Sequence, residues 1–251
     1  MDLINKINLS RKTLKKYLEP EWDTSIISDY SNQEIEKIYT SKSHKNNEIS
    51  FGKATSFNLK LSHRLVPSHK LHIIYYNFPE LNSRLLKITK ACGQKMLDLY
   101  TKEIIDPEDS ILLILTDTIT ENIETTIEEI YKKGQEYLMI NNLSDNIIDE
   151  NEKLGKDKLR NEHFRNIHVF NLNTLTVDIG KHKLVPKHEC IRKEKEIEDI
   201  LMETNTIRKQ LPIILRKDPM AKLLRLAPGD ICKITRPSDK CGEYQYYRIC
   251  V

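Results

Sequence analysis

Glycine is scarce in this sequence, with only 7 residues among 251. Phosphate-binding loops need several glycines within a few residues, because their backbone must approach the phosphate closely. The chain has no such cluster, and it lacks the P-loop, dinucleotide-binding, nucleophile-elbow and protein-kinase patterns. These absences exclude the commonest nucleotide-using and acyl-transfer enzymes. We therefore expect no catalytic residues, no cofactor and no small-molecule ligand.

Paired cysteines and long apolar runs are missing as well. The five cysteines include no C-x-x-C pair, and their odd number fits neither a disulfide framework nor a zinc knuckle. We therefore expect no metal site and a reducing environment. The longest uninterrupted apolar run, Ile111 to Leu115, has the length of a strand rather than of a membrane span. The first eleven residues lack the apolar core of a signal peptide, so we expect no membrane partner.

Charge is unevenly distributed along the chain. Residues 181–251 carry 16 basic and 10 acidic side chains, a net charge of +6, whereas the other 24 basic and 27 acidic side chains give −3. A basic C-terminal part can face nucleic acid or an acidic partner. A solvated charged surface explains the charge as well, and on charge alone we favour that interpretation.

The first 179 residues alternate between helical and extended patterns. Ser10 is a candidate N-cap for a helix that Pro20 ends. Apolar spacing predicts a short helix near Ile35 and Ile38, strands at Phe57–Leu61 and Leu71–Tyr76, and an amphipathic helix from Glu80 to Tyr100.

The clearest unit of this half begins at the apolar run Ile111–Leu115, which is typical of a buried strand. Thr118 and Glu121 have the spacing of a capping box, and Gly134 is a natural helix stop. Tyr137–Ile140 would be the next strand. Strand, helix and strand form a βαβ unit, so the predicted fold class is α/β, within an α+β organisation overall.

Residues 141–162 are polar and predict a surface insertion, and the alternating stretch Ile167–Ile179 predicts one or two strands before a domain boundary near Gly180. The C-terminal part shows sharper signals. We expect a helix at Glu194–Glu203, a helix start at Asp218-Pro219, a turn at Pro228-Gly229-Asp230, and a hairpin of Ile231–Thr235 with Tyr244–Val251.

Three other groups of residues suggest chemistry. Asp106, Glu108 and Asp109 precede a strand, as metal-binding carboxylates of nucleases do. No Glu-x-Lys follows on the adjacent strand, so we favour an acidic turn. Tyr244, Tyr246, Tyr247 and Arg248 could clamp single-stranded nucleic acid, but strand neighbours face opposite sides. We therefore expect no single stacking platform, and core packing or a protein interface instead.

The string His182-Lys-Leu-Val-Pro-Lys-His188 has two histidines around a rigid apolar centre. Without a cluster of further ligands, it predicts a structural role rather than a metal site. His63-Arg-Leu-Val-Pro-Ser-His69 repeats the pattern, but the similarity ends after seven residues. We interpret the first copy as a coincidence without a role.

Residues 180–251 resemble the assembly domain of an RNA polymerase subunit family, which archaeal RNA polymerases contain and which eukaryotic RNA polymerases I, II and III share as a common fifth subunit. The matching pieces lie in the family's order and nearly at its spacing. They are His182-x-Leu184-Val185-Pro186-Lys187-His188, Gln210-Leu211-Pro212, Asp218-Pro219-Met220-Ala221, Pro228-Gly229-Asp230, Lys233 to Arg236 with Ser238, and Gly242-x-Tyr244 with Tyr247-Arg248-Ile249. The chain departs from the family pattern at Ile213, Arg225 and Glu243.

The resemblance implies a non-catalytic subunit of a multisubunit DNA-dependent RNA polymerase. Residues 180–251 would dock on the largest subunit, with other polymerase subunits nearby, and residues 1–179 would form a jaw-like domain near downstream duplex DNA. The candidate DNA loop contains Thr118, Thr120 and Asn122, and contacts there would be weak and non-specific. The protein would work in the nucleus. Its divergent jaw also fits a large DNA virus, with action in the cytoplasmic virus factory and the virion.

Two other classes of protein remain open on the sequence. A free-standing transcription regulator would bind duplex DNA without the polymerase, and its binding would weaken with salt. A nuclease would need converging carboxylates and a lysine in a cleft. The order of six motifs favours the polymerase subunit over both.

Overall fold

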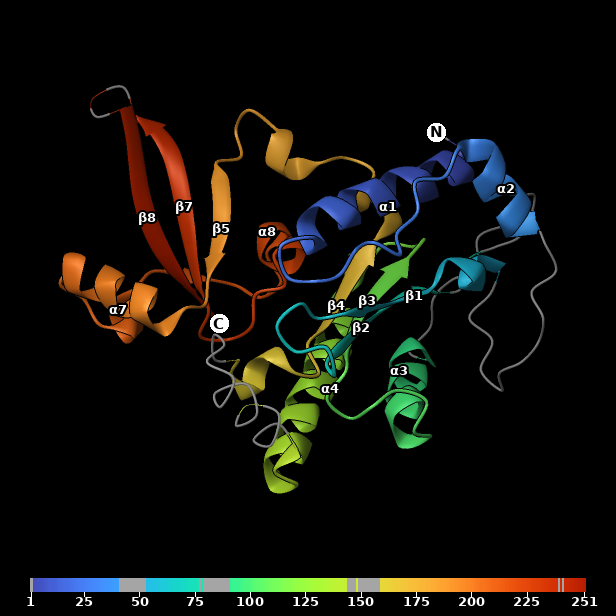
Figure 1. The fold of residues 1–251 in the computed structure, drawn as a ribbon, viewed down its shortest axis with the longest axis horizontal. Coiled ribbons are helices and arrows are strands. Elements are labelled where there is room, and N and C mark those ends of the chain that lie inside the picture. The colour runs from blue at the N-terminus through green and yellow to red at the C-terminus, as the bar shows by residue number, and fades with distance from the viewer. Residues whose placement is uncertain are drawn as a thin grey trace. The chain divides into compact units, whose positions relative to one another are not determined.

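The computed structural model describes residues 2–40, 53–76, 78, 91–143, 148, 159–238, 240 and 242–251. The chain packs into two compact units, each with a four-stranded sheet. Unit 1 comprises Met1–Leu143 and Phe164–Val177, and unit 2 comprises Ser144–His163 and Asp178–Val251. Both units mix helices and strands, which confirms the predicted α/β class (Figure 1). Within the described ranges, no helix combines the length and apolarity needed to cross a bilayer.

Unit 1 is a sheet in the order β1-β2-β3-β4 with helices on both faces (Figure 1). Its elements are α1 (Leu3–Leu18), α2 (Asn32–Thr40), the 3-10 helix η1 (Lys53–Phe57), β1 (Leu59–Ser62), β2 (Lys70–Tyr76), α3 (Ala91–Thr101), β3 (Ser110–Leu115), α4 (Glu121–Ile140), β4 (Ile167–Asn171) and α6 (Leu172–Leu175). β2, β3 and β4 are parallel, and β1 pairs antiparallel with β2.

The parallel strands explain where the helices lie. Because β2, β3 and β4 follow one another in one direction across the sheet, right-handed crossovers place α3 and α4 on the same face. Met96 of α3 and Ile127 and Ile130 of α4 join one core with alternate residues of the strands, such as Leu113. α1 lies on the other face, where the Ser10 hydroxyl is 3.1 Å from the Tyr75 hydroxyl.

Several predicted elements of unit 1 are confirmed. α2, β2 and β3 lie where the apolar spacing placed them, and β3 is buried at every position. Residues 80–90 lie outside the described residues, but α3 confirms the end of the predicted helix near Tyr100. The first strand is shorter than expected, because Phe57 belongs to η1 and β1 begins at Leu59.

The predicted helix starts at Ser10 and Thr118 are wrong. α1 begins seven residues earlier, at Leu3, and Ser10 is buried with its hydroxyl donating to the Ile7 carbonyl. α4 begins at Glu121, with Thr120 rather than Thr118 at the N-cap position. The Asn171 side chain donates to the carbonyls of Thr116 and Asp117, where the chain bends after β3 before α4 begins.

α4 also continues past Gly134, the predicted stop, through the predicted strand Tyr137–Ile140. The second strand of the βαβ unit is β4 instead. Leu138 is fully buried on the same helical face as Ile130, so tertiary packing overrides the glycine signal. A Cβ at position 134 would lie 2.5 Å from Cδ and Nε of Arg165, which explains the glycine.

The prediction of strands throughout Ile167–Ile179 is wrong after Asn171, where β4 ends. The Asn171 side chain accepts a hydrogen bond from the Asn173 backbone N–H at 2.8 Å and thereby caps α6. Leu172 and Leu175 are buried in this short helix, which packs against α1. The alternation of apolar residues in this stretch therefore reflects a helical turn rather than a strand.

Unit 2 is a sheet in the order β5-β7-β8-β6, with a described helix packed on each face. Its described elements are the 3-10 helices η2 (Asn161–His163), η3 (Ile179–Lys181) and η4 (Arg208–Gln210), strands β5 (Lys187–Ile191), β6 (Ile213–Ile214), β7 (Ile231–Ser238) and β8 (Gly242–Cys250), and helices α7 (Glu194–Glu203) and α8 (Pro219–Leu223). The predicted helix at 194–203 and the predicted hairpin are confirmed. The predicted insertion 141–162 lies mostly outside the described residues, which include only 141–143, 148 and 159–162 of it.

Gly134 provides a test of packing in unit 1. Glycine to alanine within a helix ordinarily stabilises by about 1 kcal/mol. Here the added methyl group must displace the buried Arg165 guanidinium, which stacks 4.0 Å from the Tyr100 ring centre. We expect Gly134→Ala to lower the free energy of unfolding by about 1–3 kcal/mol. Urea unfolding followed by fluorescence of Trp22, the single tryptophan and a buried residue of this unit, measures the change.

The matched control is the same substitution in an Arg165→Ala background. With the overlapping side chain removed, Gly134→Ala should stabilise rather than destabilise. An equal loss in both backgrounds would contradict the proposed clash.

Candidate assembly interface

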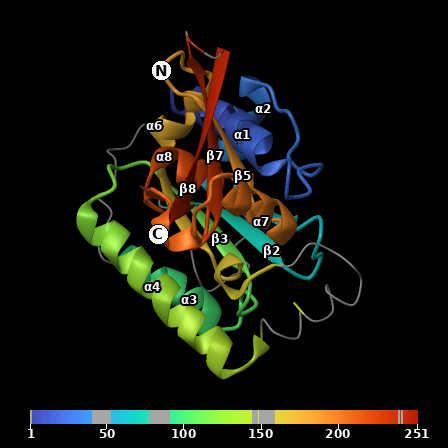
Figure 2. The same ribbon diagram turned by 90° about the vertical axis from the view of Figure 1, so that its left-hand side faces the viewer.

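The β7–β8 hairpin extends beyond the rest of its sheet (Figures 1 and 2). β5 pairs with β7 only from Ile231 to Thr235, and β6 pairs with β8 only at Ile249 and Cys250. From Gly242 to Tyr247, β8 therefore has β7 as its single described neighbour strand. Gly242 has φ +76°, a left-handed conformation that permits the entry into β8.

The register of the hairpin sorts its side chains onto two faces. Arg236 pairs with Tyr244 and Ile234 with Tyr246, and directly opposed residues share a face. The Tyr244 and Tyr246 rings stack with centroids 6.1 Å apart and planes inclined by 20°. The Arg236 and Arg248 guanidinium carbons lie 4.8 and 5.6 Å from the Tyr246 ring centroid. These four side chains form the aromatic–arginine face.

This arrangement corrects the expectation that these residues cannot share a platform. Tyr244, Tyr246 and Arg248 are two residues apart and so point the same way, whereas only Tyr247 points to the opposite face. Tyr247 packs against α7, where burial, together with the negative charges of Glu203 and Glu196, raises the pKa of its hydroxyl. Tyr247 therefore packs against the core on the α7 side and Tyr246 packs partly against the core on the α8 side, whereas Tyr244 is exposed.

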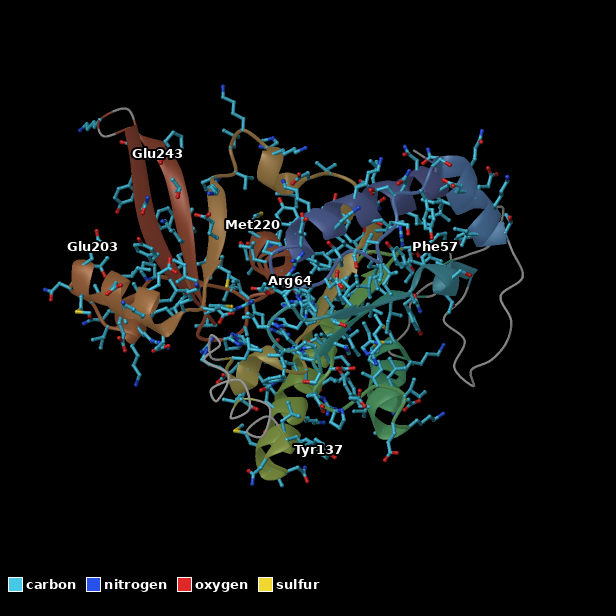
Figure 3. The ribbon with its side chains drawn as sticks, viewed as in Figure 1. Phe57, Arg64, Tyr137, Glu203, Met220 and Glu243 are labelled. Atoms are coloured by element: carbon cyan, nitrogen blue, oxygen red, sulfur yellow. The ribbon has the colours of Figure 1, made fainter. Side chains whose placement is uncertain are left out.

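Charge differs between the two faces of the sheet. On the aromatic–arginine face, Arg248 donates to the Ile213 carbonyl at 3.0 Å, and its Nε has no partner within the part of the chain that the structure describes. The opposite face carries the exposed pair Lys187–Glu189, 2.7 Å apart. Glu243, near the tip of the hairpin, also belongs to that opposite face (Figure 3). The aromatic–arginine face is therefore the cationic one.

Helices α7 and α8 cover opposite faces of the same sheet. Ile197 and Ile200 of α7 pack with Ile191 and Ile231. Ala221 of α8 packs with the other face through Cys232, Ile234 and Cys250. Figure 3 shows this separation, with Glu203 on α7 and Met220 on α8 on either side of the sheet. The aromatic–arginine face continues the side that α8 covers.

The predicted cap at Asp218 is present in the structure. Its carboxylate accepts hydrogen bonds from the Met220 N–H at 2.8 Å and the Ala221 N–H at 3.4 Å, and Pro219 occupies the first turn of α8. Leu211 is buried, and the Pro212 carbonyl accepts from the Ile249 N–H at 2.8 Å. These motif residues fix the fold of the module beneath the hairpin.

The two histidines of the 182–188 string bond to the backbone of their own turn. His182 Nδ1 accepts from the Leu184 N–H at 3.2 Å, and His188 Nδ1 lies 2.7 Å from the Pro186 carbonyl. Leu184 is 82% exposed, whereas Val185 and Pro186 are half-buried. Among the described residues, no group of three or more His, Cys, Asp or Glu side chains has the arrangement of a metal site.

The echo of this string, residues 63–69, shares one local hydrogen bond with it. His63 Nδ1 accepts from the Leu65 and Val66 N–H groups at 3.2 Å, and the bond from Leu65 has its counterpart at His182 in the other copy. Both histidine rings of the echo lie about 5 Å from the Trp22 ring, at 5.0 and 5.1 Å between centroids. In the structure this copy forms the turn that leads into β2, with His63, Val66 and His69 buried.

The acidic turn before β3 agrees with the favoured interpretation. Asp109 is fully buried and accepts from the Lys70 backbone N–H at 2.8 Å, with His72 Nε2 also at 2.8 Å. Asp106 is exposed, and burial raises the pKa of Glu108. The three carboxylates therefore lie in different environments, and Asp109 joins the starts of β2 and β3.

Sequence reasoning placed Asp230 only in a turn and missed its electrostatic role. The carboxylate is 1% exposed, and its Oδ2 accepts from the Ala227 N–H at 2.9 Å and from Arg192 Nε at 3.2 Å. Burial and this nearby negative charge raise the pKa of the Cys190 thiol. The available signal was an aspartate directly before a buried strand, which requires a partner of opposite charge.

The candidate DNA loop lies at the carboxyl end of β3. Thr118, Thr120 and Asn122 are all exposed, and Thr120 makes no side-chain cap hydrogen bond. Glu121 and Glu124 occupy the first turn of α4 beside them. The carboxyl edge of a parallel sheet commonly holds binding sites, but the two glutamates oppose the approach of phosphate.

Comparison with known proteins now adds to this geometry. Residues 177–250 match the family described as RNA polymerase Rpb5, C-terminal domain. Subunit rpabc1 of DNA-directed RNA polymerases I, II and III from Dictyostelium discoideum is 43% identical over 82 residues, which are 33% of this chain and 41% of that subunit. RNA polymerase subunit Rpo5 of Sulfurisphaera tokodaii is 47% identical over 74 residues, or 30% and 87% of the two chains. Rpo5 of Archaeoglobus fulgidus is 49% identical over 70 residues, or 28% and 91%.

Most of unit 2 thus coincides with a domain that is found in DNA-directed RNA polymerase subunits. The chain belongs to the Rpb5/Rpo5 family of DNA-directed RNA polymerase subunits. The matches cover the C-terminal 30% or so of the chain and less than half of the Dictyostelium subunit.

The Asp218 cap provides a test of the module's fold. Asp218→Ala removes both side-chain hydrogen bonds at the start of α8 and should lower stability by about 0.5–2 kcal/mol. Because Trp22 reports on unit 1, the measurement is amide hydrogen exchange of α8 and β7. Asp199→Ala, at an exposed position of α7, is the matched control and should leave exchange unchanged. Equal exchange rates in both variants would contradict a structural cap.

Proposed function

We propose that this chain is a non-catalytic subunit of a multisubunit DNA-dependent RNA polymerase, and that residues 180–251 form an assembly domain on the largest subunit. Membership of the Rpb5/Rpo5 family carries the proposal. Polymerisation would belong to other subunits. The protein would work where its polymerase works, in the nucleus or, for a viral enzyme, in the cytoplasmic virus factory and virion.

The aromatic–arginine face is the surface that we assign to docking. Aromatic and arginine side chains are enriched in the energetically dominant centres of protein interfaces. Tyr244 is 57% exposed, and Arg236 has no acidic partner within the described residues. Both guanidinium groups are thus available for charge-assisted hydrogen bonds to carboxylates of a partner. The free edge of β8 beside them can add backbone hydrogen bonds.

We further propose that unit 1 forms a jaw-like domain bordering downstream DNA. Exposed Thr118, Thr120 and Asn122 offer hydroxyl, amide and helix N-terminal N–H donors to the phosphate backbone. None of these groups reads a base sequence, so any contact would be non-specific. Glu121 and Glu124 keep such contacts weak.

Two other functions are less well supported. A free-standing regulator would need a DNA-binding surface of its own, and among the described residues the cationic face carries two guanidinium groups. A nuclease would need carboxylates that converge on an accessible metal, whereas Asp109 is fully buried against Lys70 and His72.

Neutralising the aromatic–arginine face tests the docking proposal. Arg236→Gln with Arg248→Gln should weaken association with the largest subunit at least about tenfold, because each lost charge-assisted contact costs roughly 2–5 kcal/mol when its partner is left buried. Affinity-tagged full-length chains are expressed in the source cells, and the co-purified polymerase is measured. Lys187→Gln with Lys233→Gln removes the same charge from the opposite face and should leave co-purification unchanged. An equal loss of co-purified polymerase in both double variants, or no loss in either, would contradict docking through this surface.

Photocrosslinking tests the jaw proposal. A photoreactive amino acid at Thr118 should crosslink to downstream duplex DNA in a transcribing complex. The same group at the exposed Lys102, which lies at the amino edge of the parallel strands, should not. No crosslink at Thr118, or equal crosslinking from both positions, would place the loop away from DNA.

A further inference from the structure

The Asp230 carboxylate has two partners from outside the stretch that matches the family. Arg160 Nη2 donates to Oδ1 of Asp230, and His163 Nε2 lies 2.7 Å from the same oxygen. Arg192 and the Ala227 N–H, which lie inside the matched stretch 177–250, occupy the other oxygen. The carboxylate is therefore bonded on one side by the module and on the other by residues that precede it.

The segment 159–163 forms an ordered turn with buried side chains. Leu159 is 4% exposed and His163 is 7% exposed. The Arg160 backbone N–H donates to His163 Nδ1 at 3.0 Å, while the His163 N–H donates to the Arg160 carbonyl at 3.0 Å in η2. Since Nδ1 accepts a hydrogen bond, the neutral ring carries its proton on Nε2, which is the atom that faces Asp230. The turn thus orients the imidazole as a donor to the carboxylate.

Gly229 shows that the module accommodates this segment closely. A Cβ at position 229 would lie 2.2 Å from Arg160 Nη1. Gly229 also has φ +86°, so the family's Pro-Gly-Asp turn provides both the backbone conformation and the space that the guanidinium needs. The Asp230 carboxylate and the space left by the absence of a Cβ at Gly229 together form a site for the Arg160 side chain, called the socket below.

The charges in the socket favour the ionised carboxylate. Burial by itself would raise the pKa of Asp230, but the positive charge of Arg192, the hydrogen bond from His163 and the positive charge of Arg160 together hold that pKa well below its usual range. Two of these three groups come from the 159–163 segment. Removing them would leave a buried carboxylate with Arg192 as its remaining cationic partner within the described residues.

Two archaeal relatives have little sequence outside the stretch that matches this chain. The matched stretch already makes up 87% of the Sulfurisphaera tokodaii Rpo5 and 91% of the Archaeoglobus fulgidus Rpo5. We propose that residues 159–163 are an intramolecular ligand of the C-terminal module, so that the folded module of this chain consists of this segment together with residues 178–251. The proposal is independent of docking on the polymerase, because it concerns the isolated chain.

Amide hydrogen exchange of the purified full-length chain tests this proposal. Arg160→Gln and His163→Phe each remove donors to Oδ1, and each should accelerate exchange of the β7 and β8 amides at least fivefold. Arg208→Gln is the matched control, because Arg208 is similarly accessible (32% against 27%) and pairs with Glu194 away from the socket. Acceleration below fivefold in either socket variant, or equal acceleration in the control, would overturn the proposal.

Two further measurements separate a direct interaction from general destabilisation. Arg160→Lys, which keeps the charge, should exchange more slowly than Arg160→Gln. In an Asp230→Asn background, Arg160→Gln should change exchange less than twofold, because the charge that it pairs with is gone. An unchanged effect of Arg160→Gln in that background would mean that the segment acts elsewhere.

The pH dependence of hydrogen exchange provides a third test. A lowered folded-state pKa contributes stability that is complete above the unfolded value, near pH 4, and is lost as the pH falls through the folded value. The exchange rate of Arg160→Gln divided by that of the native chain should therefore stay constant from pH 7 to pH 5. In more acidic medium this ratio should fall toward 1. A ratio that narrows between pH 7 and pH 5 would contradict a role for the Asp230 charge.

Discussion

The antiparallel register of the β7–β8 hairpin is the constraint on which the functional account depends. Because Arg236 opposes Tyr244 and Ile234 opposes Tyr246, two guanidinium groups and two stacked rings share one face of the sheet. A shift of one residue would send these side chains to the side that α7 covers. The apolar residues at the base of the hairpin hold the register, since Ile231 must meet α7 while Cys232 and Ile234 must meet α8.

The same module depends on electrostatics beneath the hairpin. Asp230 directly precedes β7, and its buried carboxylate meets Arg192 on one side and the 159–163 segment on the other. A buried charge with several hydrogen bonds positions the groups around it strongly, because any displaced partner leaves a costly unpaired group. Apolar packing thus determines on which face of the sheet each side chain of the hairpin lies. The Asp230 contacts determine the position of the start of β7. The two requirements act on adjacent residues of one strand.

The sequence predicted several features that depend on neighbouring residues, but it did not predict features that depend on contacts between distant parts of the chain. Asp218-Pro219, helix 194–203 and the buried strand at Ile111 follow from capping, periodicity and hydrophobicity, which are local. Gly134 was misread because the reason for it, Arg165, lies on a different element. The tyrosines were misassigned to different faces although their spacing determines the face. Asp230 could not be understood locally, because its partners are 38, 67 and 70 residues away in sequence.

A cryo-electron microscopy structure of the polymerase purified through this chain tests the central claim most directly. The account predicts density for this chain within the complex, with Arg236, Tyr244, Tyr246 and Arg248 buried against the largest subunit. A complex that contains the chain with this face open to solvent, or a chain that purifies without any polymerase, would contradict it.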